Sequence, residues 1–183
     1  MSLPAIFDEC CNAESVGARF DMTRPFPLGE YAYATDSRIA VRARHAHAAL
    51  LHTPQNRPPV ERLPWMTPAT PEVELPDVGD GMATCDQCKG DGKVVGYTPE
   101  LAGGIGYTSE CWECDGKGKF RDPARVQVGP VLLTRGYVAL LRRHGVTRVR
   151  PSLMPAADSR KVDAPAVYFA GDGFEGLLMG CRH

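Results

Sequence analysis

The sequence has little of what marks several common classes of protein. Its 183 residues contain no apolar run of about 18 residues, the length that a membrane-spanning helix needs. No N-terminal stretch has the order of a signal peptide. Neither charge sign dominates, because 21 Lys and Arg residues face 22 Asp and Glu residues and the net charge is -1. We therefore expect a cytoplasmic protein without membrane contact and without an overall polycationic surface.

Recognisable catalytic motifs are also missing. Residues 103–106 read Gly-Gly-Ile-Gly but lack the Lys-Ser/Thr of a phosphate-binding loop. Ser152 and Ser159 do not lie in the Gly-x-Ser-x-Gly pattern of a nucleophile elbow. The histidines between positions 45 and 52 have a spacing that suits a strand, in a region that favours helix or loop, so we interpret them as solvent-exposed. We predict that the protein is not an enzyme.

What the sequence does contain is a repeated cysteine motif. Four of its seven cysteines lie in two copies of the frame Cys-x-x-Cys-x-Gly-x-Gly, at residues 85–92 and 111–118. Two residues between cysteines let both sulfurs reach one metal ion, and two such pairs provide the thiolates of a closed tetrahedral zinc site. We predict one structural Zn²⁺ ion. Its ligands would be Cys85, Cys88, Cys111 and Cys114.

The glycines of the two frames contribute to this prediction. The first glycine of each frame permits the positive φ that a cysteine knuckle needs, and the second removes a side chain where the knuckles meet. Four sulfur ligands leave no open coordination position, so the metal would stabilise the fold instead of catalysing a reaction. The four knuckle glycines are Gly90, Gly92, Gly116 and Gly118.

Other uses of these cysteines compete with zinc. A redox-active Cys-x-x-Cys pair needs a helix that starts after its first cysteine, and the frame glycines disfavour a helix there. Disulfides need an oxidising compartment. Iron fits the same spacing and stays open as an alternative. The sequence assigns no role to Cys10, Cys11 and Cys181.

The repeated Cys-x-x-Cys-x-Gly-x-Gly frame resembles the cysteine-rich zinc domain of DnaJ-type chaperones. The resemblance covers only residues 83–120, and two repeats instead of four imply one zinc site instead of two. A similar two-repeat form occurs in the anti-TRAP class of small zinc proteins. The His-Pro-Asp signature of a J-domain is absent. The resemblance therefore implies zinc binding and, as an alternative function, chaperone-type binding of unfolded or partner polypeptides.

Proline and glycine divide the chain into three parts. Seven prolines between residues 53 and 81 exclude a helix or a central strand and indicate an extended, Pro-rich arm, to which Trp65 and Met66 would add contacts with the body. Residues 82–121 would form the zinc insert. Residues 1–52 and 122–183 would form the two halves of one body domain.

The body shows both helix and strand patterns. Residues 30–35 and 38–43 flank an Asp-Ser turn, which indicates a β-hairpin. An apolar stripe predicts a helix over residues 135–144, capped by Thr134 and ended by Gly145. Short helices are expected at 3–11 and 45–51. Further strands are expected at 93–97, 105–109, 125–133 (with a break at Gly129-Pro130), 146–153, 166–170 and 174–179. We therefore predict an α+β fold with a small zinc-binding β-hairpin insert.

Two short motifs of the body read Tyr-Ala-Thr-Asp-Ser-Arg-Ile-Ala at residues 33–40 and Gly-Leu-Leu-Met at residues 176–179. Both resemble parts of bacterial sliding clamps, the processivity subunits of replicative polymerases, although Ser37 replaces the usual glycine. Similar hairpins at residues 31–41 and 167–179 suggest a duplicated half-unit. The resemblance implies a single clamp-like antiparallel-sheet domain with a DNA-associated role in a bacterium or phage.

Positive charge is concentrated in the last third of the chain. Between residues 135 and 161, seven basic residues are opposed only by Asp158. A continuous basic face would contact phosphate, whereas a solvated surface is the simpler interpretation. The candidate nucleic-acid contacts are Arg135, Arg142, Arg143, Arg148 and Arg150. We predict an accessory factor that binds protein or nucleic acid, with homo-oligomerisation as an open alternative.

Overall fold

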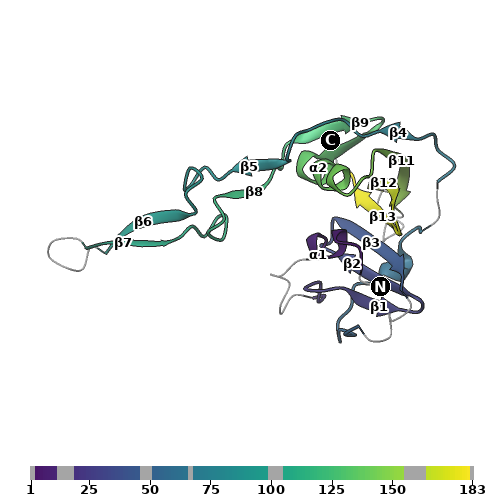
Figure 1. Cartoon of the computed structure of the whole chain (residues 1–183), viewed down its shortest axis with the longest axis horizontal. Coiled ribbons are helices and arrows are strands. Elements are labelled where there is room, and N and C mark those ends of the chain that lie inside the picture. The colour runs from purple at the N-terminus through teal and green to yellow at the C-terminus, as the bar shows by residue number, and fades with distance from the viewer. Residues whose placement is uncertain are drawn as a thin grey trace.

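A computed structural model of the protein describes residues 3–11, 19–45, 51–65, 68–98, 105–154 and 164–181. It consists of a body and a long projection from it (Figure 1). This projection is the predicted zinc insert at residues 82–121, and the name arm is used for it from here on; residues 53–81 are the Pro-rich segment. A seven-stranded sheet organises the body, and all its neighbouring strands run antiparallel. From edge to edge its strands are β1 (Phe26–Leu28), β2 (Tyr31–Thr35), β3 (Ile39–Arg44), β13 (Phe174–Met179), β12 (Ala164–Gly171), β11 (Arg148–Met154) and β4 (Val73–Glu74).

Two similar hairpins meet at the centre of this sheet. Strands β2 and β3 form one hairpin and β12 and β13 form the other, and β3 pairs with β13 so that Ala40 lies opposite Leu177. A helix precedes each set of three strands: α1 (Ile6–Glu9) comes before β1, β2 and β3, and α2 (Arg135–Arg143) comes before β11, β12 and β13. The two hairpins that look alike in the sequence are therefore neighbours in one sheet.

The main hydrophobic core covers one face of the sheet. Alternation along β3 directs Ile39 and Val41 into this core. Helix α2 buries its apolar stripe against it, including Leu140 and Leu141, and α1 adds Phe7. The hairpin of β9 (Arg125–Val128) and β10 (Val131–Thr134) also contributes to the core. Burial of each such side chain stabilises the body by about 1.5–3 kcal/mol.

The Pro-rich segment packs on two sides of the body. A 3-10 turn at Val60–Arg62 lies against the second face of the sheet, where the Trp65 ring meets the Tyr33 ring at 5.5 Å. Farther along the chain, Leu75 and Val78 are buried in the main core. The predicted contact of Trp65 with the body is present, while Met66 lies outside the described residues. The described parts of residues 51–81 therefore lie along the surface of the body.

The α+β, clamp-like fold prediction is wrong. The described part of the chain is mostly β, with a seven-stranded antiparallel sheet and three two-stranded sheets beside two short α-helices. Residues 33–40 do form the β2–β3 hairpin, in which Asp36 Oδ1 accepts bonds from the backbone of the turn and Ser37 has a φ of 74°. Such a motif specifies a local turn, however, and does not specify how distant strands pair. Because α1 has only four residues and α2 only nine, the sheet dominates the fold.

Most of the local predictions agree with the structure. The helix expected at 135–144 is α2, although Thr134 makes no side-chain cap bond. The break expected at Gly129-Pro130 is present: Gly129 adopts a φ of 55° and turns the chain between β9 and β10. Residues 46–50 of the expected helix at 45–51 lie outside the described residues. No helix in the described part of the chain is long and apolar enough to cross a membrane.

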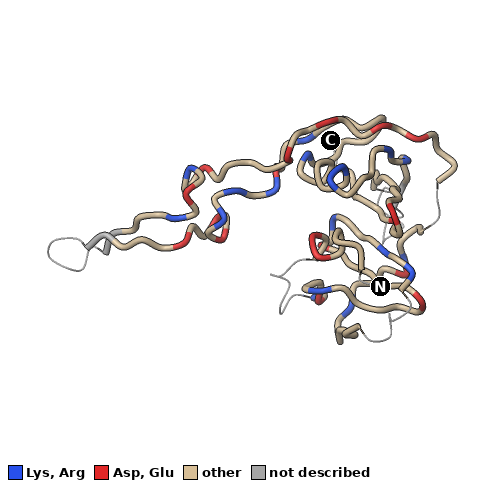
Figure 2. Tube along the Cα trace, in the orientation of Figure 1, with Lys and Arg blue, Asp and Glu red and all other residues tan. Residues whose placement is uncertain are grey.

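The arm consists of two small antiparallel sheets. Strand β5 (Met82–Thr84) pairs with β8 (Lys119–Arg121) next to the body, and β6 (Lys93–Thr98) pairs with β7 (Ile105–Glu110) farther out. The two cysteine frames lie between these sheets. Figure 1 shows the arm leaving the body beside α2 and extending away from it. Residues of both charge signs occur along its length (Figure 2).

Candidate metal centre

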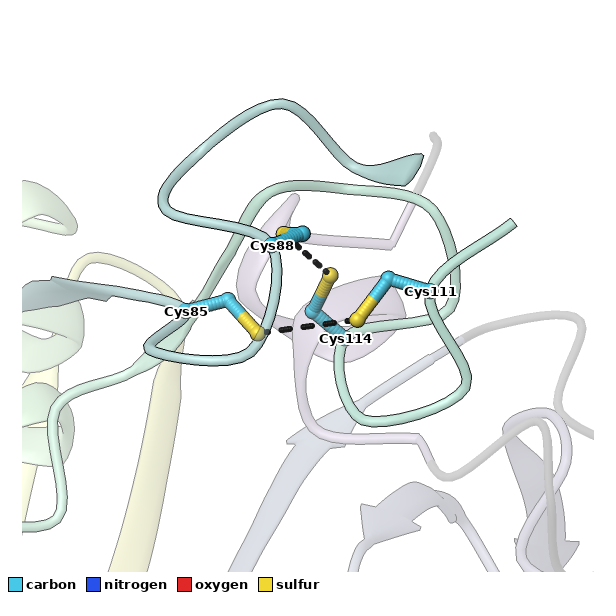
Figure 3. Close-up of side chains that lie close together, drawn as sticks. All are labelled: Cys85, Cys88, Cys111 and Cys114. Atoms are coloured by element: carbon cyan, nitrogen blue, oxygen red, sulfur yellow. Dashed lines mark hydrogen bonds between the residues drawn. The ribbon is translucent and has the colours of Figure 1, made fainter. Parts of the chain in front are cut away.

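The four predicted ligands come together in the middle of the arm (Figure 3). Their sulfur atoms all lie within 4.8 Å of one another. The Sγ–Sγ distance is 3.7 Å for Cys85 and Cys111 and also for Cys88 and Cys114. A tetrahedral ion with sulfur ligands at about 2.3 Å separates those sulfurs by about 3.8 Å, whereas a disulfide bond is about 2.05 Å long. The cluster can therefore bind one metal ion.

This cluster is closed to solvent. All four cysteines are buried, and the partly buried side chains of Val94 and Phe120 pack against them. Val94 belongs to β6 on the outer side of the cluster and Phe120 to β8 on the inner side. A metal ion with four sulfur ligands in this setting has no position for a substrate or an activated water molecule. The arrangement fits a structural metal site.

Backbone N–H groups within each knuckle point at the sulfurs. The amide of Gly92 donates to Cys88 Sγ and the amide of Gly118 donates to Cys114 Sγ, both at 3.2 Å. Burial raises the pKa of Cys88, but hydrogen bonds from the Gly90 and Gly92 amides and from neighbouring thiols outweigh it, and the pKa falls to about 7. At Cys114 burial outweighs the hydrogen bond from the Gly118 amide, and the pKa rises to about 12. In both knuckles the glycine amides act in favour of the thiolate, which is the form that ligates a metal ion.

The two knuckles interlock through their glycines. A Cβ atom on Gly92 would lie 2.1 Å from the Gly116 carbonyl oxygen, and one on Gly118 would lie 2.1 Å from the Gly90 carbonyl oxygen. All four glycines have a φ between 71° and 100°. The first cysteine of each knuckle donates its backbone N–H to the last glycine of the other knuckle at 2.9 Å. Each knuckle therefore supports the position of the other.

The structure does not provide the activating feature of a redox pair. Residues 85–92 and 111–118 form turns and bends, and no helix begins in either described segment. A redox-active Cys-x-x-Cys pair depends on a helix N-terminus to lower the pKa of its first thiol. The geometry of the cluster therefore favours metal binding over thiol chemistry.

The remaining cysteines are separate from this cluster. Cys10 is fully buried in the main core, and burial raises its thiol pKa. Burial also raises the pKa of Cys11 to about 12, and its thiol donates to the Phe7 carbonyl at 3.3 Å. Thiols of this kind are unreactive at neutral pH and behave as small packing groups. Cys181 forms an isolated antiparallel β-bridge with Leu132 of β10.

The five arginines proposed as nucleic-acid contacts all bind protein groups in this structure. Arg142 donates to the Leu75 carbonyl at 2.6 Å and Arg135 donates to the Val78 carbonyl at 3.0 Å, so both hold the Pro-rich segment against the body. The others form ion pairs: Arg143 with Glu9 at 2.9 Å, and Arg148 and Arg150 with Glu72 at 3.2 and 3.0 Å. These partners lie far away in the sequence, which is why the charge pattern alone did not reveal them.

One group of residues that the sequence pattern did not identify fixes the base of the arm. The Arg121 guanidinium pairs with Asp36 at 3.1 Å, donates to the Glu9 carbonyl at 3.1 Å and lies 4.4 Å from the Tyr137 ring centroid. The Tyr137 hydroxyl donates to the same Asp36 oxygen at 2.6 Å. A Cβ atom on Gly136 would lie 2.1 Å from Arg121 Cγ. A glycine inside a helix costs about 1 kcal/mol, so Gly136 was a usable signal of close approach.

Large exposed apolar side chains gather on the arm. Among the described residues, they are Met82 (42% exposed), Val95 (64%), Tyr107 (50%) and Trp112 (74%) on the arm, and Met179 (37%) on the body. Trp112 belongs to the second knuckle, where a metal ion bound by the four cysteines would hold its backbone. Exposed aromatic side chains on a rigid support are typical of binding surfaces.

Comparison with known proteins gives no relative from which a role can be transferred. No protein-family model, no curated protein and no solved structure matches this chain. Its affiliation therefore stays open, and the four-cysteine cluster and its arm are the features from which a function can be argued.

Proposed function

We propose that this protein is a non-enzymatic binding protein in which one structural Zn²⁺ ion shapes an arm that contacts a polypeptide partner. The observation that carries this proposal is a buried cluster of four sulfurs within 4.8 Å of one another, inside an arm that exposes apolar side chains. Zinc is preferred over iron because four cysteine ligands in interlocked knuckles are typical of structural zinc sites.

The arm needs such an ion for its stability. Each of its small sheets has only two strands, and an isolated hairpin of this size is marginally stable in water. Around the cysteines, only Val94 and Phe120 add partly buried apolar packing. Binding of a structural zinc ion contributes an apparent free energy of about 10 kcal/mol or more at neutral pH. The metal would thus supply the stability that the apolar packing of the arm does not.

A polypeptide suits the arm better than a nucleic acid does. The exposed side chains of Val95, Tyr107 and Trp112 are apolar or aromatic, and positive and negative residues are mixed along the arm (Figure 2). The candidate arginines of the body already have acidic or carbonyl partners. The resemblance of the knuckles to DnaJ-type chaperones supports the same choice.

Metal analysis tests the first half of the proposal. Elemental analysis of purified protein should find one zinc per chain, and the variants Cys85→Ser and Cys114→Ser should lose it. Cys181→Ser is the matched control, because this thiol lies outside the cluster, and it should keep the zinc. Protein without metal, but with rapidly reacting cysteines at 85 and 88, would contradict the structural-zinc proposal and favour the redox alternative.

A binding measurement tests the second half. We would titrate fluorescently labelled, reduced and carboxymethylated polypeptide and, in parallel, a labelled single-stranded oligonucleotide. Polypeptide binding should persist from about 50 to about 200 mM salt, whereas phosphate-driven binding would fall by orders of magnitude over this range. Tight, salt-sensitive oligonucleotide binding without polypeptide binding would overturn the choice of partner.

A further inference from the structure

The body carries an apolar groove on the face of the sheet opposite the helices. It has a volume of about 190 Å³. Its floor is the pairing of Ala40 on β3 with Leu177 on β13, and the Pro-rich segment forms one wall. Residues that line it include Phe20, Ala40, Pro59, Val60, Leu177 and Met179. A groove of this kind fits one large apolar side chain.

The charged residues beside the groove and on the arm have opposite signs. Arg38 lies at the groove, is exposed, and has no acidic partner within the described part of the chain. On the arm, Trp112 is next in sequence to Glu113, and Glu110 ends β7 two residues before it; all three residues are exposed. The arm thus offers an exposed aromatic side chain next to acidic residues, and the body offers an apolar groove beside a guanidinium group. The charges beside the two surfaces are complementary.

A single molecule does not bring these two surfaces together. The ion pair of Arg121 with Asp36 fixes the base of the arm, and the close approach of Gly81 to Ala139 leaves little room for the arm to turn there. Figure 1 shows that the arm leads away from the body. The groove of the same chain is therefore out of reach of Trp112, which could enter such a groove only in another copy of the chain.

We propose that Trp112 of one chain docks in the apolar groove of a second copy of this chain, with Glu113 facing Arg38. This inference rests on the proposed function, because it names the polypeptide that the zinc-shaped arm binds. Burial of the Trp112 ring between Leu177 and Met179 would drive the association, and the opposite charges would fix its orientation. Reciprocal docking closes a dimer, whereas one-way docking continues into a longer assembly.

Sedimentation velocity of the zinc-loaded full chain tests this proposal. The wild-type protein should be larger than one chain at micromolar concentration, and dilution should dissociate it. Trp112→Ser should raise the dissociation constant at least about 30-fold, as expected for removal of a central aromatic anchor. Met82→Ser is the matched control, since it removes another exposed apolar residue, on β5 at the base of the arm, and it should leave the dissociation constant unchanged.

Charge reversal tests the groove itself. Arg38→Glu and Glu113→Arg should each weaken the association about tenfold, and the double variant should restore it. Met179→Glu, at the exposed rim of the groove, should also weaken it. If Trp112→Ser abolishes association but Met179→Glu and the charge reversals do not affect it, Trp112 binds elsewhere and the proposed groove is wrong.

Metal content separates failure of this inference from failure of the proposed function. A chain that holds one zinc ion and stays monomeric at all concentrations overturns self-association alone. A chain that holds no metal ion overturns the proposed function as well.

Discussion

The body and the arm of this protein are stabilised in different ways. The body buries apolar side chains between a seven-stranded sheet, two helices and a β-hairpin. The arm has two-stranded sheets with few partly buried apolar residues, and a four-cysteine cluster occupies its centre. A sheet that is covered on one face can supply its own core, whereas a narrow hairpin cannot. One chain thus combines a body with its own hydrophobic core and an extension whose centre can bind one metal ion.

Removal of the metal ion should produce the largest difference in stability between the arm and the body. A chelator should unfold the arm, because about 10 kcal/mol of metal-binding free energy is lost there, and it should leave the body folded. Amide hydrogen exchange should show lost protection in β6 and β7 and unchanged protection in β12 and β13. Loss of protection in all four strands together would show that the body also depends on the metal.

A cavity in the core should destabilise the body and leave the arm intact. Leu140 is fully buried on α2, so Leu140→Ala should destabilise the body by about 2–5 kcal/mol in urea unfolding. The metal content should remain unchanged, because Leu140 is remote from the cysteine cluster. Leu132→Ala, at a partly buried position of β10, is the control and should cost less. Metal loss in Leu140→Ala would mean that the arm and the body fold as one unit.

A single methyl group should distort the interlocked knuckles. Gly118→Ala would place a Cβ atom 2.1 Å from the Gly90 carbonyl oxygen and force a side chain into a φ of 72°. We expect a loss of metal affinity of at least about tenfold, since left-handed backbone alone costs a non-glycine residue about 1–2 kcal/mol. Competition with a zinc chelator measures it. Gly79→Ala is the control, with a φ of 69° and nothing nearby, and it should leave the affinity unchanged.

The smallest expected effect concerns the junction between the two regions. Arg121→Met removes the ion pair with Asp36 but keeps the apolar part of the side chain. Because both groups are only partly buried, we expect a loss of about 1–2 kcal/mol in the free energy of unfolding of the body. Lys119→Met, on the exposed side of β8, should cost nothing measurable. Equal effects of the two variants would show that Arg121 does not anchor the arm.

Local features of this protein were predictable because neighbouring residues determine them. The cysteine spacing identified four residues whose sulfurs lie within 4.8 Å of one another. Alternating residues around Asp36 and an apolar stripe over residues 135–143 identified a hairpin and a helix. In these cases, turn chemistry, periodicity and ligand spacing act within a few residues.

Distant contacts were not predictable in the same way. The sequence motifs favoured a clamp-like α+β fold, but pairing of β3 with β13 joins the two halves into one sheet. The sequence showed an excess of arginine between residues 135 and 161 but not its partners: Arg148 and Arg150 pair with Glu72 across about 80 residues of chain.

Spacing and periodicity were enough to identify the residues that can bind a metal ion, the turns and the main helix. They did not show that the Pro-rich segment packs on the body, that Arg121 anchors the arm, or that an apolar groove opens on the outer face of the sheet. This difference arises because ligand spacing and turn geometry are short-range properties, whereas strand pairing, ion-pair partners and grooves depend on which distant surfaces meet.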